Sequence, residues 1–225
     1  MWIVKLGGSF AHDARLVPWL SMLAELGGGR VTVVPGGGPF ADAVRVSQGQ
    51  WHFADLPAHN MAVLAMAQVA HLFHALEPRL ALAADEEGIR RVLHAGQPAL
   101  WLPTMALRDA PDLLTNWEVT SDSLALWLAR LVNAERLVVV KSCAIPPVRT
   151  LVQLAADGVL DARFEPWSHD APFPIEVVDG DALERVRDAL LGGPAVAPPL
   201  ALAAAALASS GGRQRSPRPR RKPEP

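Results

Sequence analysis

The chain has 225 residues, of which half are hydrophobic and a fifth are charged, so it can bury the core of one large domain or two small ones. Its net charge of −2 is unevenly spread, because residues 211–225 carry six basic residues and one acid, which leaves about −7 on the rest. That acidic body argues against nucleic-acid binding by the fold. A single cysteine excludes an intramolecular disulfide, and no run is apolar enough to predict a membrane span, so we expect a cytoplasmic protein.

Strand and helix patterns alternate along the chain. Strands are predicted at 1–6, 30–35, 98–103, 136–142 and 174–179, and helices at 13–26, 40–47, 60–76, 85–93, 122–132 and 181–191. Most of the strands are continuous apolar runs, which is typical of parallel strands buried on both faces. The predicted fold is therefore α/β, a three-layer αβα sandwich with a mostly parallel central sheet.

Two regions stand out from this alternation. The helix over 60–76 is apolar on nearly all sides, which predicts burial or a subunit interface, and hence a homo-oligomer. Residues 193–225 are rich in Ala, Pro, Gly, Ser and Arg, and we expect a disordered tail after a folded domain of residues 1–192. A basic arm that touches acidic partners is the alternative interpretation of the tail.

Three turns are marked by glycines or hydroxyl groups. They are Gly7-Gly8-Ser9, Gly36-Gly37-Gly38-Pro39, and Thr120-Ser121-Asp122-Ser123. Because the carboxyl ends of parallel strands share one edge of a sheet, we expect these turns to border one crevice. Glycines let backbone N–H groups approach a ligand, and helix N-termini favour anions. Two glycine turns therefore predict two anionic groups held side by side.

The lysines support the same interpretation. Only three of the 21 basic residues are lysines, and Lys5 and Lys141 both lie at ends of predicted strands. A compact ammonium suits a close approach to a phosphate oxygen, although two lysines could also survive there by chance. Neither glycine turn fits the dinucleotide-binding pattern G-x-G-x-x-G, and the P-loop pattern G-x-x-x-x-G-K-[ST] is absent.

In this order, "VKLGGS", "VVPGGGPF" and "VTSDSLA" resemble the amino acid kinase superfamily, and "VVDGDALERVRDALLG" is similar to its final strand and helix. The resemblance covers roughly residues 1–192. Within the superfamily, "AHNMAVLAMAQ" is most similar to a small branch that contains the kinase of methanofuran biosynthesis, which converts an aminomethyl-furanmethyl phosphate to its diphosphate. The resemblance implies ATP as the phosphoryl donor and an anionic small molecule as the acceptor.

The resemblance also implies roles for individual residues. Lys5, Asp122 and Lys141 would be catalytic, with Asp122 orienting Lys5 or a Mg²⁺ that ATP oxygens mostly hold. Lys5, Gly7, Gly8, Ser9, Lys141 and Ser142 would bind ATP, and Gly36, Gly37, Gly38, Pro39 and Ser121 would bind the acceptor. No metal site made by the protein alone is expected. The plainer alternatives are a helix-terminus acid for Asp122 and an N-cap for Thr120 or Ser121.

One departure from the family pattern bears on function. The family usually carries a D-G pair shortly after the strand that ends near Lys141, and "VVVKSCAIPP" has none.

We expect an ATP-dependent kinase of a phosphate monoester such as (5-(aminomethyl)furan-3-yl)methyl phosphate. A carboxylate kinase of the acetylglutamate or aspartate type, or a nucleotide- or oxyanion-binding protein without turnover, is the alternative.

Other residues are weaker candidates. His71 and His74 are expected to pack a helix rather than bind metal. His52 and His59 are expected to flank a loop over the second glycine turn as solvated residues, with contact to the substrate as the alternative. Trp117 is expected to pack against the substrate ring or within the core, and Cys143 to be buried.

Overall fold

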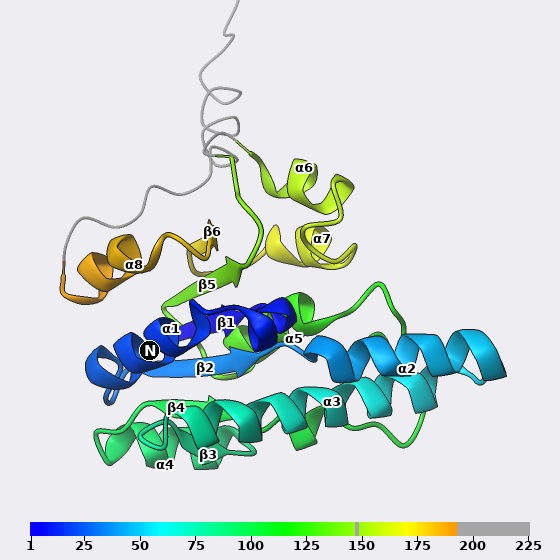
Figure 1. The fold of residues 1–225 in the computed structure, drawn as a ribbon, viewed down its shortest axis with the longest axis horizontal. Helices are drawn as coiled ribbons and strands as arrows, with labels where there is room; N and C mark the ends of the chain where they lie inside the picture. Colours follow the sequence, from blue (N-terminus) through cyan, green and yellow to red (C-terminus); the bar gives the residue numbers. More distant parts are fainter. Residues whose placement is uncertain (147–148, 193–225) are drawn as a thin grey trace, which may run out of the picture.

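The computed structural model describes residues 1–146 and 149–192, so the tail predicted over 193–225 lies outside the described residues. A single sheet of six strands forms its centre, in the order β3-β4-β2-β1-β5-β6, and every pairing between neighbours is parallel (Figure 1). The strands are β1 (Trp2–Leu6), β2 (Val31–Pro35), β3 (Ala81–Ala83), β4 (Ala99–Trp101), β5 (Arg136–Lys141) and β6 (Ile175–Asp179). The α/β fold with a parallel sheet is confirmed, while β3 was not predicted.

Helices cover both faces of this sheet. They are α1 (Leu16–Leu26), α2 (Gly38–Trp51), α3 (Asp55–Leu76), α4 (Glu86–His94), α5 (Ser121–Leu131), α6 (Leu151–Ala156), α7 (Phe164–Ser168) and α8 (Leu183–Leu190), with short 3₁₀ turns η1 (Gly8–His12) and η2 (Pro103–Ala106). Side chains of α1, α8 and the C-terminal half of α3 form one buried cluster, and those of α4, α5 and α7 form the other. The three-layer arrangement is thus built from two cores on either side of the sheet.

Strand periodicity assigns each side chain of β1 to one of these cores. Ile3 belongs to the α5 cluster, and Val4 and Leu6 belong to the α1 cluster. Because successive side chains alternate between faces, Lys5 falls on the α5 side. The same alternation in β5 places Lys141 on that side too.

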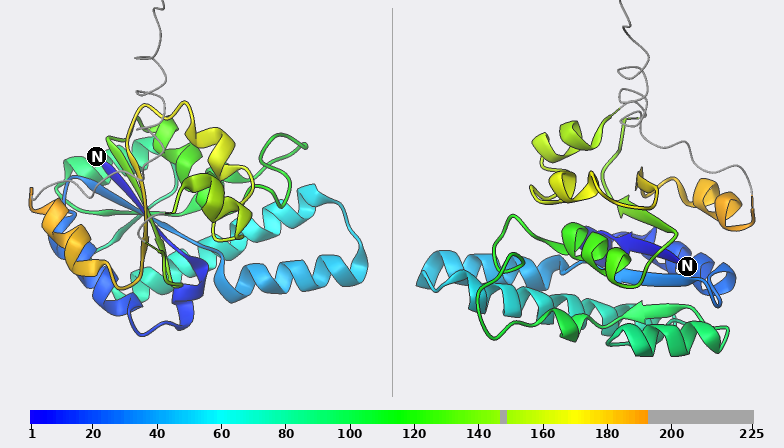
Figure 2. Two further views of the ribbon diagram at one scale, coloured as in Figure 1. Left: turned by 90° about the horizontal axis from the view of Figure 1, so that it is seen from above. Right: turned by 180° about the vertical axis from the view of Figure 1, so that it is seen from behind.

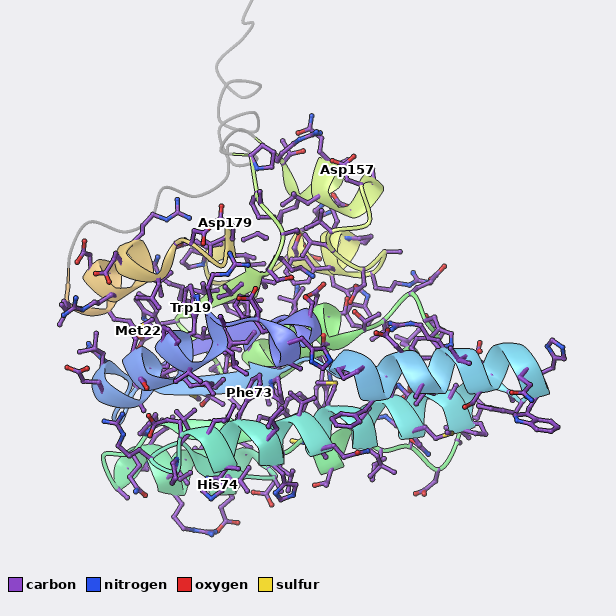
Figure 3. All side chains as sticks on the ribbon, viewed as in Figure 1. Trp19, Met22, Phe73, His74, Asp157 and Asp179 are labelled. Atoms are coloured by element: carbon purple, nitrogen blue, oxygen red, sulfur yellow. The ribbon has the colours of Figure 1, made fainter. Side chains whose placement is uncertain are left out.

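The α1 face shows how tightly the layers pack. Trp19 of α1 and Phe73 of α3 are fully buried (Figure 3). The indole nitrogen of Trp19 donates a hydrogen bond to the carbonyl of Gly180 at 2.8 Å. This bond joins α1 to the turn after β6, so a buried polar atom is satisfied within the core.

Helices α2 and α3 lie side by side and extend beyond the sheet (Figure 2). Both are longer than predicted, since α2 runs to Trp51 rather than to residue 47 and α3 begins at Asp55 rather than at residue 60. The loop predicted around His59 was therefore wrong, because His59 is buried in α3. Although α3 has 22 residues, no helix among the described residues is long and apolar enough to span a membrane.

Candidate active site

A cavity of about 440 Å³ opens where β1, β2 and β5 end at their carboxyl ends. Its walls come from the turn after β1, the start of α2, one side of α3 and the start of α5. Ten of the predicted site residues line it: Lys5, Gly7, Gly8, Ser9, Gly37, Gly38, Pro39, Ser121, Asp122 and Lys141. The predicted crevice at the sheet edge is thus a real cavity, and it brings both glycine turns together.

At the floor of the cavity one carboxylate lies between two ammonium groups. Lys5 Nζ lies 2.6 Å from Asp122 Oδ1, and Lys141 Nζ lies 2.5 Å from Asp122 Oδ2. The Lys5 and Asp122 side chains are each 3% exposed and that of Lys141 is 14% exposed. This Lys5–Asp122–Lys141 triad carries a net charge of +1 in its ionised form, which suits an anionic ligand.

The sequence places these three side chains by a simple rule. β1 and β5 are adjacent, with Lys5 opposite Val139, so Lys141 is two residues further along and on the same face. α5 packs on that face and begins at Ser121, which brings Asp122 into its first turn. Asp122 accordingly accepts a hydrogen bond from each lysine.

Burial and charge shift the ionisation of the triad in opposite directions. Burial lowers the pKa of Lys5 from 10.5 to about 8, although the Asp122 carboxylate opposes that change. Burial would raise the pKa of Asp122, but the charges of Lys5 and Lys141 outweigh it and hold the pKa below its ordinary value. The carboxylate therefore stays ionised, while Lys5 has lost part of its preference for the ammonium form.

The two glycine turns contact each other directly. A Cβ added to Gly8 would lie 2.3 Å from the nitrogen of Gly38, and one added to Gly36 would lie 2.3 Å from the nitrogen of Gly8. Gly38 also has a φ of 53°, in the left-handed region that favours glycine. These glycines are therefore required because the backbones of the two turns contact each other. The sequence did not predict that contact.

Not every amide of the turns is available to a ligand. The N–H of Gly7 bonds Val140 O at 3.0 Å, and that of Gly36 bonds Leu6 O at 2.9 Å, so both extend the sheet. The N–H groups of Gly8, Ser9, Gly37 and Gly38, by contrast, donate to no other group of the described residues. Those four are the donors that could hold anionic oxygens.

Two predicted residues do not line the cavity. Gly36 packs behind it, against Gly8. Ser142 lies beside it, with its hydroxyl 2.5 Å from the Ser9 hydroxyl and its carbonyl accepting a bond from Arg15 at 2.8 Å. These contacts tie the turn after β1 to the end of β5.

Most residues of the far wall of the cavity were not predicted from the sequence. Trp117 donates its indole N–H to Gln48 Oε1 at 2.5 Å, and the guanidinium of Arg45 lies 4.6 Å from the centre of a Trp117 ring. Gln48 in turn donates to Asp55 Oδ1 at 3.0 Å. Arg45, Asp55 and Trp117 line the cavity here, so this wall presents an aromatic ring and both signs of charge, and Gln48 joins two of its residues. Only the tryptophan carried a recognisable signal.

Several weaker candidates have structural roles. His59 Nε2 lies 2.9 Å from Ala106 O, and His74 Nδ1 lies 2.9 Å from Leu80 O, so both join their helix to a neighbouring segment. His59 also lines the cavity. Cys143 is exposed, so its predicted burial was wrong. The described residues contain no cluster of three or more His, Cys, Asp or Glu side chains able to hold a metal ion.

Comparisons with known proteins agree with this fold. The [5-(aminomethyl)furan-3-yl]methyl phosphate kinase of Methanocaldococcus jannaschii is 27% identical over 208 residues, covering 85% of this chain and 94% of that protein. The uridylate kinase of Archaeoglobus fulgidus superposes with a TM-score of 0.62 at 16% identity, covering 86% of this chain and 97% of that one. The UMP kinase of Bacillus anthracis gives 0.62 at 15% identity, with 85% and 91% covered. The structural likenesses show the fold alone.

The family assignment comes from the N-terminal two thirds of the chain. Residues 1–144, which include both glycine turns and the whole triad, match the model of the family described as "Amino acid kinase family". The chain therefore belongs to the amino acid kinase family and is a phosphotransferase of that type.

Proposed function

We propose that the chain is a cytoplasmic ATP-dependent kinase that transfers the γ-phosphoryl group to a small phosphate monoester, within a domain spanning residues 1–192. The observation that carries the proposal is the Lys5–Asp122–Lys141 triad in a cavity bordered by both glycine turns. Phosphoryl transfer depends mainly on positioning and on stabilising negative charge. A buried cationic centre beside two sets of free amides supplies both.

The chemistry assigns a task to each part. An oxygen of the acceptor phosphate forms a bond to the γ-phosphorus of ATP while the bond to the β-phosphate oxygen breaks, giving ADP and a diphosphate monoester. The acceptor oxygen is already ionised near neutral pH, so no general base is needed. Lys5 and Lys141 would offset the charge of the transferring group, and the amides of Gly8 and Ser9 would hold ATP phosphates. The amides of Gly37 and Gly38 would hold the acceptor phosphate.

Residues 1–146 and 149–192 offer Mg²⁺ no cluster of three or more carboxylate, histidine or cysteine ligands. Both oxygens of Asp122 face lysines, so Asp122 fits the orientation of those lysines and not direct metal ligation. Mg²⁺ is usually bound through one or two carboxylates together with substrate phosphates and water. Any Mg²⁺ would then arrive on the phosphates of ATP, and we assign no residue of this chain to it.

The far wall supports an acceptor that is more than a bare phosphate. The ring of Trp117 could contact a planar group, and the carboxylate of Asp55 has no cationic partner among the described residues. A ring and a protonated amine occur together in the substrate named for the Methanocaldococcus jannaschii relative. We therefore propose (5-(aminomethyl)furan-3-yl)methyl phosphate as the acceptor.

An acceptor panel tests the proposal. The purified chain is incubated with ATP and Mg²⁺ and with the furan phosphate, uridylate, isopentenyl phosphate, acetylglutamate or aspartate, and ADP release is measured. We expect ADP with the furan phosphate, lost in Lys5→Ala. ADP with acetylglutamate or aspartate instead would show a carboxylate kinase. Tight ATP binding without ADP from any acceptor would show a binding protein without turnover.

A further inference from the structure

One carboxylate outside the cavity holds the start of α5. Asp161 Oδ2 accepts bonds from Thr120 N at 2.9 Å, Thr120 Oγ1 at 2.8 Å and Ser123 N at 3.0 Å. Its Oδ1 accepts from the hydroxyl of Ser123 and from Phe164 N at 3.0 Å. A carboxylate has about four lone-pair positions, so five donors saturate it. Asp161 lies beyond residues 1–144, which match the family.

These bonds replace the usual cap of a helix. A threonine at the N-cap normally turns its own oxygen toward an amide in the first turn. Thr120 occupies the N-cap of α5 without making that bond, and its hydroxyl donates to Asp161 instead. The amide of Ser123 is capped by Asp161, so the cap comes from a segment 38 residues further along the chain.

The position of Asp122 follows from this arrangement. Asp122 lies between the two residues that Asp161 holds, and it caps nothing itself. Both of its oxygens are therefore free to reach Lys5 and Lys141. A shift of the first turn of α5 would move this carboxylate away from at least one lysine.

We infer that Asp161 is a positioning residue for phosphoryl transfer, which fixes Asp122 between the two lysines by capping α5 from outside the cavity. The inference rests on the proposed function, since it assigns a support to that centre. Asp161 is not required to touch ATP or the acceptor.

Asp161→Asn tests the inference with little change of shape. The new amide NH₂ would face two or three N–H and O–H donors, so the first turn of α5 would have to move. In addition, the charge of Asp122 on α5 and, more weakly, that of Asp161 after α6 raise the pKa of Lys5, while the charge of Lys141 on β5 lowers it. Removing the charge of Asp161 would therefore lower the pKa of Lys5 further.

The measurement is kcat and KM for ATP and for the acceptor, from about pH 6 to about pH 10. We expect kcat to fall by about 10²-fold, as for a displacement near 1 Å, with smaller changes in KM. We also expect the alkaline fall of kcat/KM to move to lower pH. Asp157→Asn is the matched control, because Asp157 lies in the same segment at the periphery (Figure 3) and pairs with Arg149.

Three results would overturn the inference. They are an Asp161→Asn enzyme with unchanged kcat, an unmoved alkaline limb, and a variant that is only less stable while its folded fraction keeps wild-type kinetics. If Asp161→Asn does not fold, Ser123→Ala removes a single bond to Asp161. We then expect a smaller fall of kcat in the same direction, and an unchanged kcat would count against the inference.

A binding experiment separates this inference from the proposed function. If wild-type chain forms no ADP with any acceptor, the proposed function fails whatever Asp161 does. ATP affinity measured by calorimetry over the same pH range does not depend on turnover. An alkaline loss of affinity that moves to lower pH in Asp161→Asn would support the positioning role, and an unmoved loss would refute it.

Discussion

A buried carboxylate shared by two lysines leaves one positive charge without a partner among the described residues. Lys5 and Asp122 are almost fully buried, so their charges are weakly screened. A buried ion pair is not in itself a source of stability, because desolvation offsets much of the attraction. The triad is therefore better explained by the anions it would bind than by the fold it would stabilise.

The cost of breaking the triad depends on which partner is removed. Asp122→Asn leaves Lys5 and Lys141 close together without a carboxylate, whereas Lys141→Met leaves Asp122 paired with Lys5. We expect Asp122→Asn to lower the free energy of unfolding by about 3–5 kcal/mol, as for other buried pairs that lose one partner. Lys141→Met should lower the free energy of unfolding by less than Asp122→Asn does. Urea unfolding of both variants checks this order, and equal stability of Asp122→Asn and wild type would contradict it.

The ionisation of Lys5 predicts an alkaline limit to activity. Its pKa lies at about 8 in place of 10.5, so the ammonium is lost as the pH rises through about 8. We expect kcat/KM for ATP, which reports the free enzyme, to fall above that pH. Bound phosphates favour the ammonium, so the fall in kcat should lie at higher pH. A kcat/KM that stays constant to about pH 10 would rule this out.

At the scale of elements, the two glycine turns form one unit. Gly8 lies against the backbone of Gly38, so the turn after β1 and the start of α2 can only approach each other if neither carries a side chain there. Their contact fixes the spacing of the free amides on either side. The glycines thus determine both the shape of the cavity and its hydrogen-bond donors.

A pair of glycine substitutions separates this contact from helix propensity. In Gly8→Ala the new Cβ would meet the backbone of Gly38, and we expect a loss of about 1–3 kcal/mol from overpacking. Gly49→Ala in α2 is the control, because nothing lies within 4 Å of its Cβ position, and it should stabilise by up to about 1 kcal/mol. Thermal unfolding measures both. A Gly8→Ala protein as stable as wild type would show that the turns can separate.

The elements show where sequence patterns succeed and where they fail. Five strands were predicted because continuous apolar runs between helical segments leave few alternatives. β3, "ALA", was missed because it has three residues and none of them is β-branched. The start of α3 was predicted as a loop, whereas the structure continues the helix back to Asp55 with Pro57 in its first turn, where proline is tolerated.

The residues of the site likewise differ in whether the sequence carried a signal for them. Lys5 and Lys141 were singled out because they lie at the ends of predicted strands, and Asp122 because it begins a predicted helix; Lys5 and Asp122 also lie in motifs that resemble those of the family. Asp161 gave no signal, because its partners lie about 40 residues away and only tertiary folding brings them together. The role of Gly36 could not be predicted from the sequence either. A glycine that lets another backbone segment approach gives the same sequence pattern as a glycine that lets a ligand approach.

At the scale of the whole molecule, burial within the fold accounts for only part of the apolar character of α3. Val69, Ala70 and Phe73 are buried against the sheet and α1. Met61 and Leu64, however, are 40% and 48% exposed, and they lie three residues apart on one side of the helix. An exposed apolar strip on the longest of the described helices supports the expected homo-oligomer.

Solution mass tests this expectation. We predict that the wild-type protein in solution is an oligomer, with a mass of at least two chains of 24.1 kDa each, because a second copy would cover Met61 and Leu64. Leu64→Lys should shift the mass toward that of one chain, since an unpaired ammonium in an apolar interface is strongly unfavourable. Val46→Lys on α2 is the control, because Val46 is also exposed and apolar but lies on another helix, so its mass should equal that of wild type. Light scattering over a range of protein concentrations gives all three masses, and a monomeric wild type would refute an oligomer built on α3.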